Sequence, residues 1–234
     1  MARRKATTTK LEIIRCAAKH FFEEGYSSTS PRVLCDELGL STGNLTYYFP
    51  TKEDLLVVFV DILCKHQRVM MEVEAEEGVG SLLSICLEMA IMAAMCEEDP
   101  VAKDFYLATY TSPKCLEIIR RHDIARAKEV FREFCEDWDD VRFAEAETIV
   151  SGIEYATLMT TGSSAPLENR IEAAVDSILA VYNVPAELRR DKIRKTLSMD
   201  YRSVSHQVLK RFKDYIDETN EKALEELAGP SVQN

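Results

Sequence analysis

The sequence predicts an all-α protein, and three observations support that fold class. Apolar residues recur at helical spacing along most of the chain, and no segment alternates between apolar and polar residues over a useful length. The 234 residues include only 8 glycines and 7 prolines, too few for a loop-rich β-sandwich or a low-complexity chain. With 46% apolar residues, the chain can bury a core as one large domain or two small ones.

The first two helices are separated by a break at Gly25. The first helix begins near Thr9, and its apolar residues recur at the spacing of one helical stripe, at Leu11, Ile14, Ala18, Phe21 and Phe22. The second helix covers residues 31–38, because Ser30 is an N-cap residue and Pro31 suits the first helical position.

A third short helix follows the turn at Gly39. Ser41 is a candidate N-cap, Leu45 and Phe49 lie four residues apart on one face, and Pro50 ends the helix. Two short helices joined by a short turn that contains glycine are the sequence form of a helix-turn-helix.

A fourth helix is expected from Thr51 to about Glu77. Thr51 is its cap, and Glu53 and Asp54 lie in the first turn, where the helix dipole favours acidic residues. About seven further helices follow, and the tail is expected to fray. They are separated by breaks at Gly78 and Gly80, Asp99-Pro100, Ser112-Pro113, Asp139-Asp140, Gly162 to Pro166, Val184-Pro185 and Gly229-Pro230.

The net charge of −11 argues against a nucleic-acid partner, but the charge is unevenly distributed. Residues 1–52 hold eight basic and five acidic side chains, a net charge of +3. The remaining 182 residues therefore carry −14. Only the N-terminal end is suited to meet phosphates.

Cysteine usage and hydropathy favour a soluble cytoplasmic protein. The 7 cysteines are scattered without a Cys-x-x-Cys spacing, which predicts reduced thiols and neither a disulfide framework nor a metal site. The basic N-terminus is not followed by an apolar segment, so no signal peptide is expected. The most apolar stretch, residues 82–96, is interrupted by Glu88 and is too short to span a membrane.

A catalytic function has little support in the sequence. There is no glycine-rich phosphate loop, nucleophile elbow or His-Glu-x-x-His motif, and no cofactor is expected. The four histidines are isolated along the chain, and His122 is interpreted as a surface residue among charged neighbours.

The segment from Thr29 to Leu56 joins a cap, a turn glycine, a Leu-x-Tyr-Tyr-Phe helix and a Lys-Glu-x-Leu helix start in one register. Together with Ala17, Phe21, Phe22, Gly25 and Tyr26, it resembles the N-terminal DNA-binding domain of the TetR family of bacterial transcription regulators. The resemblance implies a three-helix helix-turn-helix domain over residues 1–52. It also implies a C-terminal helical ligand-binding and dimerisation domain over residues 53–229, with a flexible tail at 230–234.

The third helix has the chemistry of a recognition helix. Its apolar Leu45 and Phe49 can hold it to the domain, while small or polar residues of its first turns face base edges, namely Thr42, Gly43, Asn44 and Thr46. Asn44 can make two hydrogen bonds to adenine, a Thr methyl can touch thymine, and Gly43 lets the backbone approach the groove. The family commonly has Tyr at the position of Thr46, so the operator sequence cannot be taken from relatives.

Further DNA contacts are implied by the resemblance. Tyr47 and Tyr48 correspond to positions that contact the DNA backbone or a base, although either could instead pack within the domain. Lys52 matches the family's phosphate-binding lysine, and Ser30 is a second candidate for a phosphate contact. Arg32 matches a position that reaches guanine in some members, and the alternative is a solvated surface arginine.

A basic segment precedes the first expected helix. Arg3, Arg4 and Lys5 are interpreted as a flexible arm that adds phosphate or minor-groove contacts. A solubilising or cloning-derived tail is an equal alternative.

By the same resemblance, the C-terminal domain forms the homodimer. One helix supplies small residues at Ala144, Ala146, Gly152 and Ala156. The next has an apolar face made of Ile171, Ala174, Val175, Ile178, Leu179 and Tyr182. Two such helices could meet their symmetry mates in a four-helix interface, although packing within one chain explains the same pattern.

A ligand pocket is expected between helices rich in methionine and aromatic residues, which suit an adaptable apolar site. The alternative is that these side chains belong to an ordinary core. The candidate pocket residues are Met92, Tyr106, Tyr110, Tyr155 and Met159.

The sequence therefore predicts a regulator, most simply a repressor, that binds a palindromic double-stranded operator as a dimer and is released by a small-molecule effector. The main alternative is a coactivator of the same fold that contacts another protein instead of DNA. The intact Asn44, Tyr47, Tyr48 and Lys52 disfavour that alternative.

Overall fold

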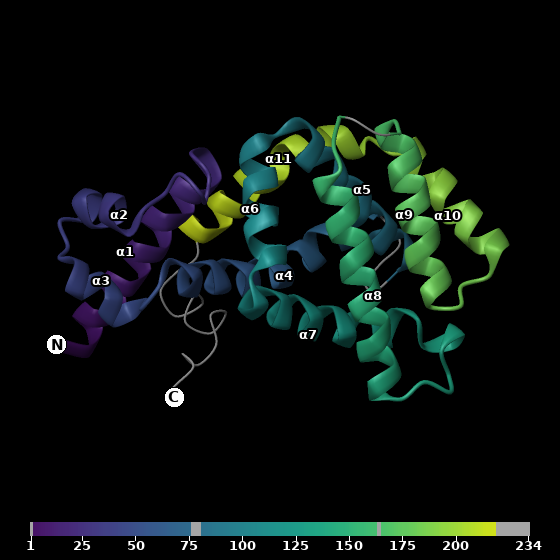
Figure 1. The fold of residues 1–234 in the computed structure, drawn as a ribbon, viewed down its shortest axis with the longest axis horizontal. Helices are drawn as coiled ribbons and strands as arrows, with labels where there is room; N and C mark the ends of the chain where they lie inside the picture. The colour runs from purple at the N-terminus through teal and green to yellow at the C-terminus, as the bar shows by residue number, and fades with distance from the viewer. Residues whose placement is uncertain (1, 76–80, 163–164, 219–234) are drawn as a thin grey trace.

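The computed structural model describes residues 2–75, 81–162 and 165–218, and within these ranges the chain is helical with no strand (Figure 1). The predicted all-α fold class is confirmed. The helices are α1 Ala2–Glu23, α2 Pro31–Leu38, α3 Thr42–Tyr48, α4 Lys52–Ala75, α5 Leu82–Glu98, α6 Pro100–Thr111, α7 Pro113–Val130, η1 Arg132–Phe134, α8 Asp140–Met159, α9 Leu167–Val181, α10 Ala186–Ser198 and α11 Tyr201–Glu218. No helix in these ranges is both long and apolar enough to cross a membrane.

The helix boundaries of the N-terminal part follow the predicted caps. The backbone N–H of Val33 donates to the Ser30 hydroxyl at 3.3 Å, and that of Asn44 donates to the Ser41 hydroxyl at 3.2 Å. Gly39 ends α2 in the left-handed conformation with φ of 63°, which glycine adopts without a steric penalty.

Helix α1 begins at Ala2, seven residues before the predicted start at Thr9. Alanine, arginine and lysine are strong helix formers, so nothing in the basic segment ends the helix. The backbone of Arg3, Arg4 and Lys5 thus continues α1 instead of forming a separate arm. The tail after Gly229 and the last part of the predicted final helix lie outside the described residues.

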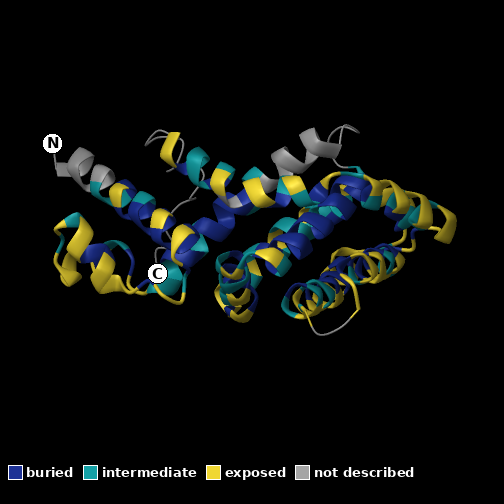
Figure 2. Cartoon of the chain, turned by 90° about the horizontal axis from the view of Figure 1, so that it is seen from above, coloured by how far each residue is buried: buried dark blue, intermediate teal, exposed yellow. Residues whose placement is uncertain are grey.

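Helices α1, α2 and α3, which are joined by short turns, form one end of the molecule. Helix α4 leads from them into the body, which consists of α5 to α11 (Figure 1). Helix α5 is the centre of that body and contacts α4, α8, α9, α10 and α11. Nearly every residue of α5 from Leu82 to Cys96 is buried, as expected for a helix that is apolar on all sides. Figure 2 shows that burial is concentrated in the inner helices, whereas α2 and α3 are mostly exposed.

An aromatic cluster joins the N-terminal helices to the body. The ring of Phe22 on α1 packs edge-on against Phe59 of α4, Phe105 of α6 and Phe212 of α11, with centroid distances of 5.1 to 5.7 Å. Because α1 contacts α4, α6 and α11 as well as α2, the N-terminal helices share one apolar core with the rest. The predicted division of the chain at residue 52 stays a prediction.

The predicted dimer face of the second C-terminal helix is wrong in its orientation. In α9 the entire apolar set is buried within the chain, because it packs against α5, α8 and α10. The exposed side of α9 carries Ala173, Ser177 and Ala180 instead. On α8, Ala146 is also buried, whereas Ala144, Gly152 and Ala156 are exposed.

Candidate DNA interface and interior cavity

The outer face of α3 presents the predicted base-reading residues to solvent. Thr42, Gly43, Asn44 and Thr46 are all exposed, while Leu45 and Phe49 are buried with 3% and 4% of their surface accessible. The two apolar residues lie on the opposite side of the helix and anchor it to the domain. A short helix with one anchored face and one exposed polar face can lie in a major groove.

Local hydrogen bonds determine which side-chain atoms of α3 are available for contacts with a base. The Thr46 hydroxyl donates to the backbone carbonyls of Thr42 and Gly43, at 3.0 and 3.2 Å, so its methyl group is left for a contact with a base. The side-chain amide of Asn44 makes no hydrogen bond to any described residue, and its donor and acceptor both remain available.

The two tyrosines of α3 differ in exposure. Tyr47 has 78% of its surface accessible, and Tyr48 is half-buried and packs against the core. Their rings meet edge to face with centroids 5.1 Å apart. Tyr48 therefore supports the position of the exposed Tyr47 ring beside the recognition surface.

Lys52 occupies a structural junction at the start of α4. Its ammonium group donates to the carbonyl oxygens of Tyr26 and Thr29, at 2.9 and 3.0 Å, and lies 4.0 Å from the centroid of the Tyr26 ring. Burial lowers the pKa of Lys52. Two of its three N–H groups thus hold the turn between α1 and α2, which leaves one for a phosphate.

The remaining predicted DNA contacts lie at the start of α2. Ser30 is exposed, with its hydroxyl oxygen accepting the capping hydrogen bond. The Arg32 side chain is 89% exposed and lies 3.7 Å from the Asp36 carboxylate, a weak surface pair. Arg32 can leave this pair to contact DNA at small energetic cost.

A cavity of about 260 Å³ lies inside the body, between α4, α5, α6, α7 and α8, and a smaller chamber of about 50 Å³ adjoins it. Of the residues proposed from the sequence for a ligand pocket, Met92, Tyr106 and Tyr110 line the larger cavity. Tyr155 and Met159 do not line either space. Tyr155 instead lies on the outer face of α8, with 39% of its surface accessible.

The sequence reasoning missed the acidic lining of this cavity. Glu88 of α5, Asp123 of α7, and Glu147 and Glu154 of α8 all face the two spaces. The interval of seven residues between Glu147 and Glu154 places both on one helix face, and this was the available signal. Without the fold, nothing indicated that this face points inward.

Burial controls the protonation of these carboxyl groups. Burial, with a further contribution from the neighbouring carboxylates of Glu147 and Glu88, raises the pKa of Glu154 to about 8, and burial raises that of Glu147 to about 7. The pKa of Asp123 is raised well above its usual value by burial and by the nearby Glu154 and Glu147. Close to neutral pH, Asp123, Glu147 and Glu154 thus retain protons to a large extent.

The histidines are less isolated than the sequence indicated. His122 is half-buried, lines the cavity, and contacts the carboxylate of Asp61 at 2.7 Å, so its interpretation as a surface residue is wrong. His20 contacts Glu37 at 2.7 Å and, with Cys16, forms a set of potential metal ligands within 4.8 Å of one another. Lys19 also pairs with Glu37 at 3.0 Å, and this pair offsets the carboxylate charge.

Polar contacts connect the cavity helices to the N-terminal helices. The carboxylate of Asp104 on α6 accepts hydrogen bonds from the backbone N–H, at 2.7 Å, and the hydroxyl of Ser27. Gly25, with φ of 101°, leaves room for this carboxylate, which would lie 3.1 Å from an added Cβ. Lys114 at the start of α7 pairs with Asp54 of α4 at 2.8 Å. A shift of α6 would therefore move the turn before α2, and a shift of α7 would move the start of α4, just after α3.

We expect Lys52→Ala to lower the free energy of unfolding by roughly 1.5 to 3 kcal/mol, because two turn carbonyls lose a charged donor. Urea denaturation of the full chain measures this change. Arg32→Ala is the matched control and should stay within about 0.5 kcal/mol of the parent. Equal effects of the two substitutions would contradict the junction role of Lys52.

We expect Glu154→Gln to flatten the pH dependence of stability between about pH 4.5 and 8. With a folded pKa above the unfolded value, the protonated carboxyl contributes stability below about pH 4.5 that is lost as pH rises through the folded pKa. The variant should therefore gain stability relative to the parent at pH 8, by up to about 1.4 kcal/mol per pH unit of the window. Thermal unfolding at several pH values measures this, and an unchanged slope, as expected for the exposed control Glu117→Gln, would refute it.

The chain is similar to several solved structures. Among solved structures, the chain aligns with a gamma-butyrolactone receptor described as an ArpA-like protein, at 19% identity over 90% of this chain and 100% of that chain, with a TM-score of 0.42. The chain also aligns with the TetR family protein CprB from S. coelicolor A3(2), at 19% identity over 92% of this chain and 100% of that chain, with a TM-score of 0.37. A third alignment is with TylP, a tetR regulator from Streptomyces fradiae, at 18% identity over 94% of this chain and 96% of that chain, with a TM-score of 0.48. No curated protein gives a significant sequence match.

The sequence profile described as "Bacterial regulatory proteins, tetR family" matches residues 13–58. This range begins within α1, includes the whole helix-turn-helix and the Lys52 junction, and ends in the second turn of α4. The resemblance seen in the sequence is thereby confirmed. Residues 13–58, which contain the helix-turn-helix of this chain, thus match the tetR family of bacterial regulatory proteins.

Proposed function

We propose that the protein is a ligand-responsive transcriptional repressor that binds a near-palindromic DNA operator as a homodimer. The observation that carries the proposal is the exposed polar face of α3, on a domain of a regulatory family. The proposed DNA contacts are those of Ser30, Arg32, Thr42, Gly43, Asn44, Thr46, Tyr47, Tyr48 and Lys52. Bases are read from α3, and phosphates are held from the starts of α2 and α4.

The proposed dimer interface is the outer face of α8 and α9. On α8 this face exposes Val141, Ile149 and Tyr155, with 65%, 53% and 39% of their surfaces accessible. On α9, the exposed residues include Ala173, Ser177 and Ala180. Small residues on both helices allow a close approach of a second copy, in a four-helix arrangement. Such a dimer would present two α3 helices to major grooves about 34 to 36 Å apart.

The interior cavity is the proposed effector site. Its walls include Val60 of α4 and Phe105 of α6, next to the Phe22 cluster that holds α1. An effector that prefers an altered position of α6 would move Asp104, and with it the turn between α1 and α2. The two reading domains would then separate, and the operator affinity would fall.

The distribution of charge supports one orientation on DNA. The −14 carried by the residues after 52 is repelled by the duplex, whereas the +3 of residues 1–52 is attracted. This difference favours approach of the N-terminal helices to the phosphates.

We expect Asn44→Ala to cost roughly 1 to 3 kcal/mol of affinity, mainly at one base position of a duplex selected from a random library. Affinity for random duplex should change little, because Asn44 carries no charge. Fluorescence anisotropy with single-base operator variants measures the effect, and Arg190→Ala on α10 is the distant control. A uniform loss on specific and random DNA would refute a base-reading role.

We expect Ile149→Glu to convert the dimer to a monomer, because two charged residues would be buried where the two α8 helices meet. Analytical ultracentrifugation measures the mass. Leu107→Glu is the matched control, since Leu107 is likewise an exposed apolar residue, with 40% of its surface accessible, but it lies on α6. A parent protein that is monomeric at micromolar concentration, or a dimer that tolerates Ile149→Glu, would contradict this interface.

A further inference from the structure

The two adjoining spaces contain more acidic groups than their basic groups can neutralise. Four carboxyl groups line them, and Glu88 is ion-paired with Arg126. Among the described residues, the side-chain carboxyl groups of Glu147 and Glu154 accept hydrogen bonds only from the phenols of Tyr182 and Tyr110, the latter at 2.9 Å. Asp123 has no hydrogen bond or ion pair to any described residue.

The other basic groups near the cavity are already engaged. Lys65 and His122 both contact the carboxylate of Asp61, each at 2.7 Å, and Arg121 reaches the same group at 3.1 Å. Arg120, close to Glu147, donates to the Ser151 hydroxyl from two nitrogens at 3.3 Å. In the described part of the chain, no basic side chain forms an ion pair with Asp123, Glu147 or Glu154. Arg126, together with Arg120 in the case of Glu147, lowers their pKa only through its more distant charge, and this effect is smaller than that of burial.

Tyr106 independently indicates a ligand. Its side chain lines the cavity with only 4% of its surface accessible, and its hydroxyl has no hydrogen-bond partner among the described residues. A buried hydroxyl without a partner is costly, so the free phenol is a site that a bound molecule can satisfy.

The rest of the wall suits the apolar part of such a molecule. Met92 and Phe105 are apolar and buried, and the aromatic rings of Tyr106 and Tyr110 stand beside the carboxyl groups. Aromatic faces attract cations, and a methionine side chain adapts to ligands of different shape. The volume of about 260 Å³ is near the lower limit for a small-molecule pocket.

We propose that the effector is a small organic cation, an ammonium or amidinium compound, whose charged group lies among Asp123, Glu147 and Glu154 and whose apolar part contacts Met92 and Phe105. This inference rests on the proposed function, and it names the chemical class of the effector. Tyr106 provides a hydroxyl that orients the ligand. The charge of the cation replaces that of the protons on these carboxyl groups, and the protons pass to the solvent.

The affinity for a cation should consequently rise with pH. Burial raises the pKa of all three carboxyl groups, to about 7 for Glu147 and about 8 for Glu154, so cation binding should strengthen as these two groups ionise at neutral pH and above. The titratable or charged groups that face them from the surrounding helices are Cys64 and Lys65 of α4, Glu88 of α5, Tyr106 and Tyr110 of α6, Arg120, His122 and Arg126 of α7, and Tyr182 of α9. A neutral ligand that accepts hydrogen bonds from the protonated acids would show the opposite trend.

Isothermal titration calorimetry of the full chain tests the proposal with matched probes. The cationic probes are benzyltrimethylammonium, benzylamine and benzamidine, and the neutral isostere of the first is neopentylbenzene. We expect at least one cation to bind at least tenfold more tightly at pH 8 than at pH 6, with net proton release in buffers of different ionisation enthalpy. The proposal is overturned if no cation binds up to millimolar concentration, if the isostere binds as tightly, or if affinity falls as pH rises.

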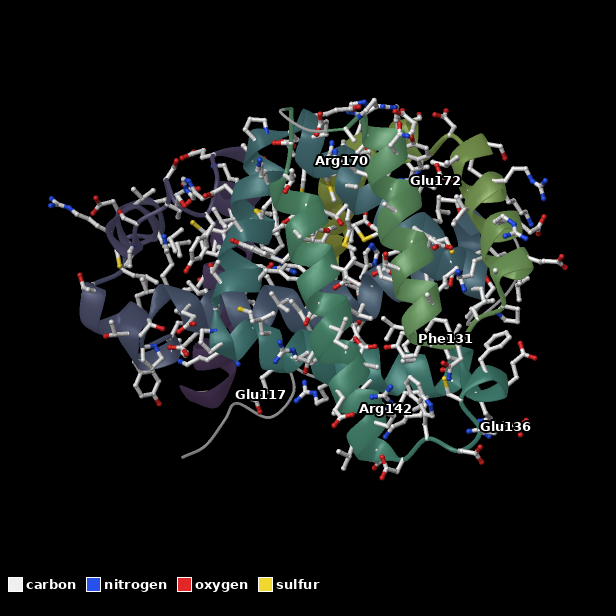
Figure 3. The ribbon with its side chains drawn as sticks, turned by 45° about the vertical axis from the view of Figure 1, so that its right-hand side comes forward. Glu117, Phe131, Glu136, Arg142, Arg170 and Glu172 are labelled. Carbon is white, nitrogen blue, oxygen red and sulfur yellow. The ribbon has the colours of Figure 1, made fainter. Side chains whose placement is uncertain are left out.

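Two variants assign the site, so that a folding defect in one leaves the other informative. Asp123→Asn and Glu154→Gln should each weaken cation binding at least tenfold at pH 8, whereas Glu117→Gln should leave it unchanged. Figure 3 shows Glu117 on the outer side of α7, away from the cavity. Unchanged affinity in both cavity variants, in folded protein, would overturn the assignment.

DNA binding, measured on the same samples, distinguishes a failure of the proposed regulatory function from a failure of the proposed ligand chemistry. Cation binding in a protein that binds no duplex would refute the proposed regulator and leave the cavity chemistry standing. Release of DNA by a neutral lactone and by no cation would refute the inference and leave the regulator standing.

Discussion

The ammonium group of Lys52 is the interaction on which the geometry of the DNA-binding end depends. It holds the carbonyls of Tyr26 and Thr29 while it stacks on the Tyr26 ring, so the first residue of α4 and the turn before α2 are joined at one point. The orientation of α2 fixes that of α3, because Gly39 and the Ser41 cap leave only a short turn between them. The exposed face of α3 is therefore positioned by contacts that α3 itself does not make.

The same junction links the recognition surface to the body. Asp104 on α6 binds Ser27, and Lys114 on α7 binds Asp54, within the region that Lys52 organises. Both α6 and α7 also form walls of the interior cavity. In the proposed regulator, a ligand that changes their spacing would act on the helix-turn-helix through these direct contacts, without a long chain of intermediates.

Electrostatics divide the molecule into two kinds of site. The N-terminal part has an excess of basic residues, and two of them, Lys19 and Arg32, have exposed side chains. The body buries carboxyl groups around the cavity, and this costs stability near neutral pH unless they are protonated or paired. Retaining Asp123, Glu147 and Glu154 in such a place is understandable if a ligand compensates them.

The sequence by itself determined the features that depend on neighbours within a few residues. The caps at Ser30, Ser41 and Thr51, the break at Gly39 and the inward face of Leu45 and Phe49 follow from local hydrogen bonding and helical periodicity. Only the tertiary structure decided which side of α9 is exposed, that Tyr155 faces outward, that His122 meets Asp61, and that Glu147 and Glu154 face inward. An amphipathic pattern shows that one face is buried but does not identify the surface that covers it, and a charged residue shows its partner only after distant helices pack together.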